Sequence, residues 1–326
     1  FVAERPYLSA TNMFIDSFIG YLKTERNYSQ HTLRAYEGDL RSFESFLSRI
    51  DESIDFFSAD LDLVRSWVSE LMDAGAAPSS VCRKLSALRS FYAYQRSNGV
   101  GVDNPAATLQ GPKRRKKLPV FVKEEEMNRL IDEVSFGEGY AACRDRMIIV
   151  LFYETGIRLS ELIGLDTADV DMGASVIKVT GKRNKQRIIP YGDEFGDSLR
   201  HYLMERKTFM QQKVSEQTSL FLDEVTGQRI NPVKVRNLVK SYLSMVTTQQ
   251  RRSPHVLRHT FATAMLNRNA DLQSVKELLG HERLSTTEIY THTTFDQLKE
   301  MYNLAHPRAK YKKGGNYGNQ DSGNPF

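Results

Sequence analysis

Residues 253–290 read SPHVLRHTFATAMLNRNADLQSVKELLGHERLSTTEIY, and the rest of the chain is organised around this stretch. Ser253 suits the N-cap of a helix, and Pro254 suits its first turn. Gly280 is placed to end a second helix, whose apolar residues lie between 275 and 279. The stretch therefore predicts two helices that follow each other closely.

Polar side chains gather around these helices. His255 and Arg258 are three residues apart and share one face in the first turns of their helix, where backbone N–H groups and the helix dipole favour an anion. His281 follows in a short loop. A capping box, S-T-T-E at residues 285–288, predicts a further helix with Tyr290 in its second turn. Neighbouring elements thus deliver two histidines, an arginine and a tyrosine to one place.

This pattern resembles the catalytic C-terminus of the tyrosine recombinases of the phage-integrase type. Their signature is His-x-x-Arg, then a His or Trp, then a nucleophilic Tyr nine residues later, and the matching residues here are His255, Arg258, His281 and Tyr290. The closing segment STTEIYTHTTFDQLKEMYNLAHPRA is most similar to the Xer-type members. The resemblance covers about residues 12–313 and implies a site-specific DNA recombinase.

The same resemblance implies further site residues. In TGIRLSELIGL, Arg158 falls on the first catalytic arginine of the family, and Glu161 falls on an acidic position that supports the site. By itself, such an i,i+3 pair is more typical of a surface ion pair. Lys182 lies where the family has a hairpin lysine that enters the DNA minor groove and acts as general acid, and Lys185 is the fallback. A lysine in a turn is otherwise normally solvent-exposed without a role. Arg183 stands where relatives often have glycine.

Composition sets broad limits on the protein. The chain has 326 residues, 40% of them hydrophobic, which predicts about two domains with sizeable cores. A formal net charge of +5 mildly favours a polyanionic partner. Cys82 and Cys143 form neither a disulfide framework nor a thiolate metal site, which fits the cytoplasm. The chain shows no membrane span and no signal sequence, and Met13 could be the native start.

We predict a mainly α fold in two domains. The first is a four-helix core-binding bundle, SAM-like by the resemblance. The second is a mixed α/β catalytic domain, mostly helical with a small antiparallel sheet or hairpin. The expected parts are an N-terminal extension at 1–11, the helical DNA-binding domain at 12–110, a basic linker at 111–117, the catalytic domain at 118–313 and a disordered tail at 314–326.

Periodicity and turn residues predict the individual elements. Helices are expected in the first domain at 12–26, from Ser29, from near Ser58 to Gly75, and from about Ser79 to Gly99. The second domain should contain helices at 124–134, 144–154, 193–212 and 231–248, a hairpin of 175–181 with 186–191, and a terminal helix ending near Pro307. The helix after Ser253 should bury Leu257, Phe261 and Met265. That leaves His255 and Arg258 on another face, free for a ligand.

Two basic regions outside the signature admit two interpretations. The last helix of the first domain displays Arg83, Lys84, Arg89 and Arg96. The linker reads GPKRRKK. Charge runs are often only solvated surface. The resemblance favours contact with DNA phosphates in both places, because the recombinases clamp DNA between two domains and such contacts add salt-dependent affinity.

The candidate site contains no carboxylate cage, which argues against a two-metal nuclease. His255 and His259 have the i,i+4 spacing of zinc ligands, but the glutamate of H-E-x-x-H is missing and Arg258 would repel a cation. We therefore expect His259 to be a structural histidine bonded within the core. No phosphate-binding loop of the ATPase type is present, and no cofactor or metal is expected.

Fixed cations with one tyrosine suit metal-free phosphoryl transfer. Arg158 and Arg258 can hold the non-bridging oxygens of the scissile phosphate. His255 is the expected base for Tyr290 or an added phosphate donor, and His281 donates a hydrogen bond. Lys182 protonates the departing 5′-oxygen. A 3′-phosphotyrosine keeps the phosphodiester energy, so a second 5′-hydroxyl can reseal the strand without ATP.

The leading hypothesis is a Xer-type recombinase working in the cytoplasm on double-stranded DNA. Such an enzyme acts as a tetramer of identical or paralogous protomers on two duplexes, through a Holliday junction. By resemblance, it resolves chromosome or plasmid dimers during cell division, and a septal DNA translocase is a candidate partner. The alternatives are an integrase or invertase of a mobile element, a type IB topoisomerase, and a non-catalytic DNA-binding protein.

Overall fold

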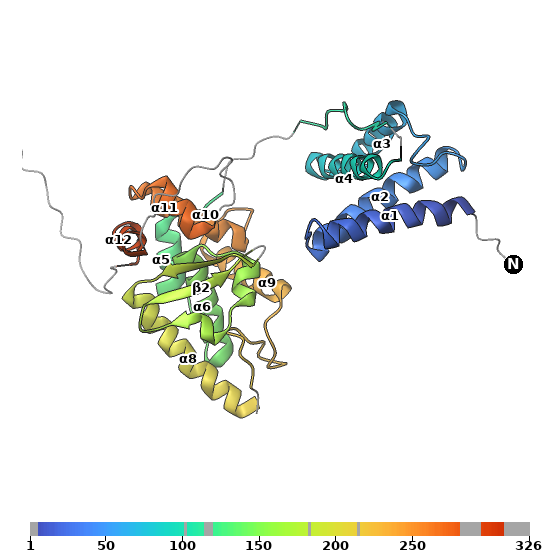
Figure 1. Cartoon of the computed structure of the whole chain (residues 1–326). Helices are drawn as coiled ribbons and strands as arrows, with labels where there is room; N and C mark the ends of the chain where they lie inside the picture. The colour runs from blue at the N-terminus through green and yellow to red at the C-terminus, as the bar shows by residue number, and fades with distance from the viewer. Residues whose placement is uncertain are drawn as a thin grey trace, which may run out of the picture. The chain divides into compact units, whose positions relative to one another are not determined.

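The computed structural model describes residues 6–100, 103–113, 120–181, 184–213, 216–280 and 295–309, with side chains from residue 13 onward and from 297 in the last range. The chain divides into two compact units, Phe1–Lys117 and Leu118–Phe326. Figure 1 colours the first unit blue to teal and the second green to red. Within the described ranges, no helix is both long and apolar enough to cross a membrane.

The N-terminal unit is built from α1 (Pro6–Thr24), α2 (Gln30–Ile50), α3 (Leu61–Asp73) and α4 (Pro78–Ser97). The hydroxyl of Ser29 caps α2 by accepting from the amide of Thr32, as its sequence position predicts. The helices enclose an aromatic core in which Phe43 packs against Trp67 with ring centroids 4.8 Å apart. The predicted helical bundle is confirmed, although α1 begins earlier than expected.

Three cations on α4 have structural partners that the sequence did not reveal. Arg83 and Lys84 both pair with the buried carboxylate of Asp39 on α2. Arg89 donates to the carbonyls of Ala106 (2.8 Å) and Leu109, and so holds the segment after α4 against the helix. Neither of the two predicted interpretations, a solvated face or a DNA contact, included this role. Arg96 is exposed.

The second unit contains α5 (Glu124–Asp132), α6 (Gly139–Thr155), α7 (Leu159–Gly164), η1 (Thr167–Asp169), α8 (Asp193–Lys213), α9 (Pro232–Val246), α10 (Pro254–Asn267), α11 (Leu272–Leu279) and α12 (Phe295–Ala305). Its sheet has the order β1 (Val170–Asp171), β2 (Val176–Thr180) and β3 (Gln186–Pro190). Both pairings are antiparallel, and Val179 lies opposite Arg187. The mainly α fold with a small antiparallel sheet is therefore confirmed.

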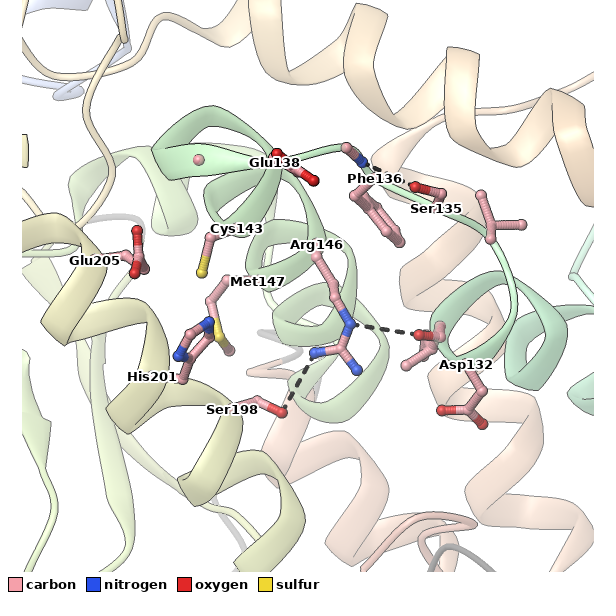
Figure 2. Close-up of a pocket in the computed structure, with 15 residues that line it drawn as sticks. Asp132, Ser135, Phe136, Glu138, Cys143, Arg146, Met147, Ser198, His201 and Glu205 are labelled. Carbon is pink, nitrogen blue, oxygen red and sulfur yellow. Dashed lines mark hydrogen bonds between the residues drawn. The ribbon is translucent and has the colours of Figure 1, made fainter.

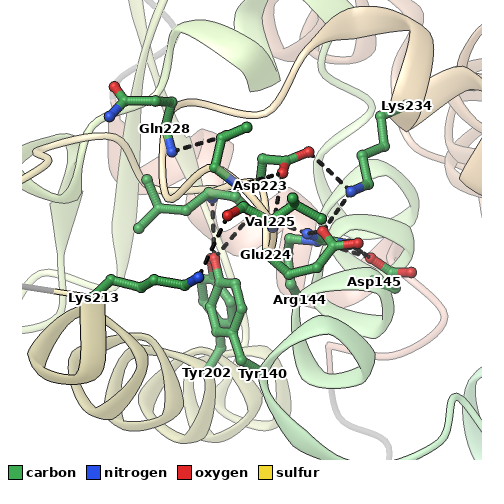
Figure 3. Close-up of polar contacts among 12 residues, drawn as sticks. Tyr140, Arg144, Asp145, Tyr202, Lys213, Asp223, Glu224, Val225, Gln228 and Lys234 are labelled. Atoms are coloured by element: carbon green, nitrogen blue, oxygen red, sulfur yellow. Dashed lines mark hydrogen bonds and ion pairs between the residues drawn. The ribbon is translucent and has the colours of Figure 1, made fainter. Parts of the chain in front are cut away.

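Helix α6 forms the centre of this unit and packs against α8 and α10. It begins at Gly139, before the predicted start at 144, so that Arg144 lies inside the helix, where it is only 1% exposed. Figure 3 shows that Arg144 pairs with Asp145 (2.6 Å) and Glu224, while Lys234 reaches Asp223 (2.9 Å) and Glu224. This network ties the loop before α9 to α6.

The end of the described chain lies on its own unit. Helix α12 packs against α10, α11 and β3. The hydroxyl of Tyr302 donates to Glu154 (2.7 Å), and Arg308 forms two bonds to Asp132 of 2.9 and 3.0 Å. Since Tyr302, Glu154 and Arg308 are buried, the segment after the signature is anchored by polar contacts as well as by apolar ones.

Candidate functional site: three arginines at the end of α11

Gly156 allows α6 to end where the site begins. Its φ of +58° places it in the left-handed region, and a Cβ there would lie 2.5 Å from Phe261 on α10 and 2.8 Å from Leu279 on α11. Only glycine meets both conditions without strain. The close approach of three helices delivers Arg158, two residues later, to the N-terminus of α7.

Arg158 bridges α7 and the end of α11. Its guanidinium donates to Glu161 (2.7 Å) and to the carbonyl of Gly280 (2.8 Å). The backbone amide of Arg158 also donates to Glu161, at 2.8 Å. The arginine side chain remains 40% exposed. The predicted i,i+3 pair is therefore present, but its carboxylate is buried rather than on the surface.

Arg258 comes from α10, whose apolar stripe of Leu257, Phe261 and Met265 is fully buried as predicted. The expectation that Arg258 itself lies free for a ligand is wrong, because this residue is only 6% exposed. Its guanidinium donates to the carbonyls of Gly156 (2.7 Å) and Leu279 (2.6 Å). The side chain is thus held between the ends of α6 and α11.

A third arginine, Arg187 on β3, completes the arrangement and was missed by the sequence reasoning. It donates to the carbonyl of Leu278 at 2.7 Å and forms two bonds to Glu161 of 3.0 and 2.9 Å. The last carbonyls of a helix lack partners within the helix and carry the negative end of its dipole. Three consecutive carbonyls at the C-terminal end of α11, those of Leu278, Leu279 and its C-cap Gly280, therefore each receive a guanidinium from a different element.

The charges in this cluster shift each other's pKa values. Burial alone would raise the pKa of Glu161, but bonds from Arg187, followed by Arg158, lower it to about 2. Burial, followed by the charge of Arg158, lowers the pKa of Arg258 to about 10. At neutral pH the cluster therefore contains three cations and one carboxylate, which leaves a positive excess at the end of α11.

Glu161 should make the free energy of unfolding depend on pH in the acidic range. Its pKa is about 2 in the folded chain against 4.5 in the unfolded one, so it stabilises the fold above about pH 4.5 and this stabilisation is lost as the pH falls towards 2. We expect Glu161→Gln to cost about 2–3 kcal/mol at pH 7, and less at pH 3. Denaturant unfolding of both proteins from pH 7 to 3 measures this difference.

Asp197→Asn is the matched control, because Asp197 forms an exposed i,i+3 pair with Arg200. This substitution should change stability by less than about 1 kcal/mol. If the free energies of unfolding of the wild type and of Glu161→Gln differed by the same amount over the whole pH range, the low pKa assigned to Glu161 would be wrong.

His255 is exposed at the start of α10 and faces His259, with 3.1 Å between the two Nε2 atoms. The prediction that His259 is bonded within the core is wrong, because it is half-buried and bonds to the candidate base. Burial, the charge of His259 and the charge of Arg258 lower the pKa of His255. The imidazole therefore stays neutral and able to accept a proton at neutral pH.

Ser253 takes the N-cap of α10, with no bond from its side chain, and Gly280 ends α11 with φ of +66°. Lys182, Arg183, His281 and Tyr290, with the helix predicted from the capping box, lie outside the described residues. Lys185, the fallback lysine, is exposed. Its carbonyl accepts a bond of 2.7 Å from the amide of Gly181 and so closes the hairpin turn.

A cavity of about 610 Å³ lies elsewhere on this unit, between the α5–α6 connection and α8 (Figure 2). Arg146, His201 and Glu205 line it, and the three arginines of the cluster do not. Among the residues that the structure describes, no three His, Cys, Asp or Glu side chains are grouped to hold a metal.

Known proteins match both units of this chain. The model of the phage integrase family matches residues 120–297, and that of the phage integrase N-terminal SAM-like domain matches residues 15–99. Tyrosine recombinase XerC of Chlorobaculum tepidum is 38% identical over 318 residues, which cover 91% of this chain and 95% of the relative. Tyrosine recombinase XerC of Staphylococcus saprophyticus is 40% identical over 294 residues, which cover 90% and 97%.

Solved structures share the fold. XerH site-specific recombinase bound to difH substrate in a pre-cleavage complex has a TM-score of 0.64 and 23% identity, covering 88% of this chain and 83% of that one. A lambda integrase tetramer bound to a Holliday junction has a TM-score of 0.64 and 15% identity, covering 92% and 82%.

Proposed function

Because this chain belongs to the phage integrase family and is a Xer-type tyrosine recombinase, a site-specific DNA recombinase, we propose that it cleaves and rejoins DNA through a covalent phosphotyrosine on Tyr290. One observation carries the assignment of the site. Arg158 and Arg258 are held on consecutive carbonyls, those of Gly280 and Leu279, directly before His281.

In this proposal Arg158 binds the scissile phosphate, and the buried Arg258 contributes its positive charge. A guanidinium has five N–H donors, and Arg158 uses two of its nitrogens on Glu161 and Gly280 while 40% of its side chain stays exposed. Arg258 adds a second positive charge from α10. Two fixed cations match the charge that develops on the non-bridging oxygens, and such clamps contribute on the order of 10³-fold or more.

The chemical step exchanges one P–O bond for another. The Tyr290 oxygen attacks phosphorus while its proton passes to neutral His255, and His281 donates a hydrogen bond to a non-bridging oxygen. The bond to the 5′-oxygen breaks, and that oxygen takes a proton from Lys182. In the reverse direction, a 5′-hydroxyl of another strand attacks the 3′-phosphotyrosine and releases Tyr290.

We assign the reaction to a tetramer of identical or paralogous protomers on two duplexes, joined by a Holliday junction. The fold shared with a lambda integrase tetramer on such a junction supports this architecture. The identity of 38–40% to XerC recombinases supports resolution of chromosome or plasmid dimers as the biological task.

Formation of a covalent adduct tests the proposed chemistry. Mapping the genomic DNA that the protein protects supplies the cognate site, and a nicked suicide duplex bearing this site traps the adduct. We expect an adduct that forms in the presence of a chelator. Binding without an adduct would favour a non-catalytic DNA-binding protein, and relaxation of supercoils without strand exchange would favour a topoisomerase.

The His255–His259 pair predicts how cleavage depends on pH. Since His259 lowers the pKa of His255, His259→Gln should raise it, so the base becomes protonated at a higher pH. The acidic limb of the rate profile should therefore move to higher pH, with a larger loss at pH 6 than at pH 8. Single-turnover cleavage across this range measures the shift.

His201→Gln provides the control, because His201 is exposed on α8 beside the separate cavity. Its profile should match that of the wild type. An unchanged acidic limb in His259→Gln would show that His259 does not influence the base.

A further inference from the structure

Arg187 connects three elements of the catalytic unit. From β3 it forms a two-bond ion pair with Glu161 on α7 and donates to the carbonyl of Leu278 on α11. Its side chain is 14% exposed, and that of Glu161 is 2% exposed. Two parallel hydrogen bonds from a guanidinium to both oxygens of a carboxylate fix the relative orientation of the two groups. A lysine cannot form this arrangement, because its ammonium group is a single point charge.

The backbone next to two proposed site residues packs on this ion pair. A Cβ on Gly181 would lie 3.2 Å from Oε1 of Glu161, and a Cβ on Gly280 would lie 3.2 Å from Nη1 of Arg187. Lys182 directly follows the first glycine, and His281 directly follows the second. The lack of side chains at both glycines allows the hairpin and the end of α11 to approach the pair closely.

The two catalytic arginines have attachments of their own. Arg158 bonds to Glu161 and Gly280, and Arg258 bonds to the carbonyls of Gly156 and Leu279, and none of these bonds is made by Arg187. In contrast, among the described residues, the hydrogen bonds from the turn end of the hairpin to α7 and α11 all come from Arg187. Loss of Arg187 should therefore loosen the attachment of the hairpin more than the attachments of Arg158 and Arg258.

We infer that Arg187 is a positioning residue. It holds the hairpin, and with it Lys182, in a fixed position relative to Arg158 and Arg258. This inference rests on the proposed function. Arg187 does not touch the substrate and acts on the proton transfer to the departing 5′-oxygen. A displacement of about 1 Å in such a group can cost about 10²-fold in rate.

A sulfur substitution in the substrate separates this role from a merely structural one. When the bridging 5′-oxygen is replaced by sulfur, the leaving group is a thiolate, which needs no proton because thiols are far more acidic than alcohols. We expect Arg187→Gln to cleave the ordinary suicide duplex about 10²-fold more slowly than the wild type. On the sulfur-bridged duplex its rate should return to within a few-fold of the wild type.

Three further variants complete the comparison. Lys182→Ala should be rescued by sulfur in the same way, and Arg158→Ala should not. Arg229→Gln is the matched control, because Arg229 pairs with Asp166 and donates to the carbonyls of Ile163 and Leu165 at the other end of α7. It should lower stability without any preference for the sulfur-bridged duplex.

Folding defects are handled by two additional variants. Arg187→Lys keeps the charge near Glu161, and the double variant Arg187→Gln/Glu161→Gln removes the buried carboxylate that would otherwise lose both of its bonds from Arg187. Both should fold, as measured by thermal unfolding, and both should show the same rescue by sulfur. The inference would be overturned if the Arg187 variants lost cleavage rate equally on the two duplexes, or lost none on the ordinary duplex. A wild-type protein without adduct on either duplex would instead overturn the proposed function on which it rests.

Discussion

Tyr290→Phe is expected to abolish the covalent protein–DNA adduct. The substitution removes only the phenolic oxygen, so the protein should still bind its site with unchanged affinity. Removing a nucleophile leaves only the rate supplied by binding and charge stabilisation, a loss on the order of 10⁶-fold in comparable covalent catalysis. The nicked suicide duplex, followed by denaturing electrophoresis, measures the adduct, and a gel-shift assay measures binding.

Tyr242→Phe is the matched control for this loss. Tyr242 lies in the same unit, is half-buried and stacks on Phe136 with ring centroids 4.3 Å apart, so the same atom is removed without disturbing the ring. This variant should form the adduct at the wild-type rate. An adduct in Tyr290→Phe, or one that a chelator prevents, would refute the proposed mechanism.

Arg258→Ala should show the second largest effect, because it affects both catalysis and folding. Loss of the guanidinium removes one charge of the phosphate-binding site that we propose, which should slow cleavage by about 10³-fold or more. It also leaves the carbonyls of Gly156 and Leu279 without their arginine donors in a buried place. We expect a destabilisation of about 2–4 kcal/mol, measured by denaturant unfolding.

Arg206→Ala separates the two effects. Arg206 is 7% exposed and donates to the carbonyls of Ser219 and Leu220, so its loss should destabilise the unit by a similar amount. It lies outside the arginine cluster, and the folded fraction should cleave DNA normally. If Arg206→Ala slowed cleavage per folded molecule as much as Arg258→Ala, the phosphate-clamp role of Arg258 would be wrong.

Much of the fold could be predicted from local patterns. Helical periodicity and capping residues located the start of α2, the end of α11 and both ends of α9 within two residues, because amphipathic helices carry their burial pattern in their own residues. The two strands of the hairpin were also located closely, because their apolar residues and the turn between them form a local pattern. The two-residue strand β1 was not predicted, because so short a segment has no periodicity.

The candidate site was predicted less completely. Arg158, His255 and Arg258 were named from their spacing and from the resemblance, and the structure brings the two arginines to the adjacent carbonyls of Leu279 and Gly280 at the end of α11. The spacing did not show that Arg258 is buried, because burial depends on which helix ends pack around it. For Lys182, His281 and Tyr290, the assigned roles remain predictions.

The amino-acid sequence alone led to the proposed reacting groups, through the spacing within residues 253–290 and through the family resemblance of the rest of the chain. It contained no signal for Arg187, a strand residue 26 positions after its carboxylate partner Glu161 and 91 before its carbonyl partner Leu278. Such contacts arise only when α7, β3 and α11 pack together. The proposed catalytic side chains could thus be named from residue order and resemblance, while the ion pair that we propose to align them became visible only in three dimensions.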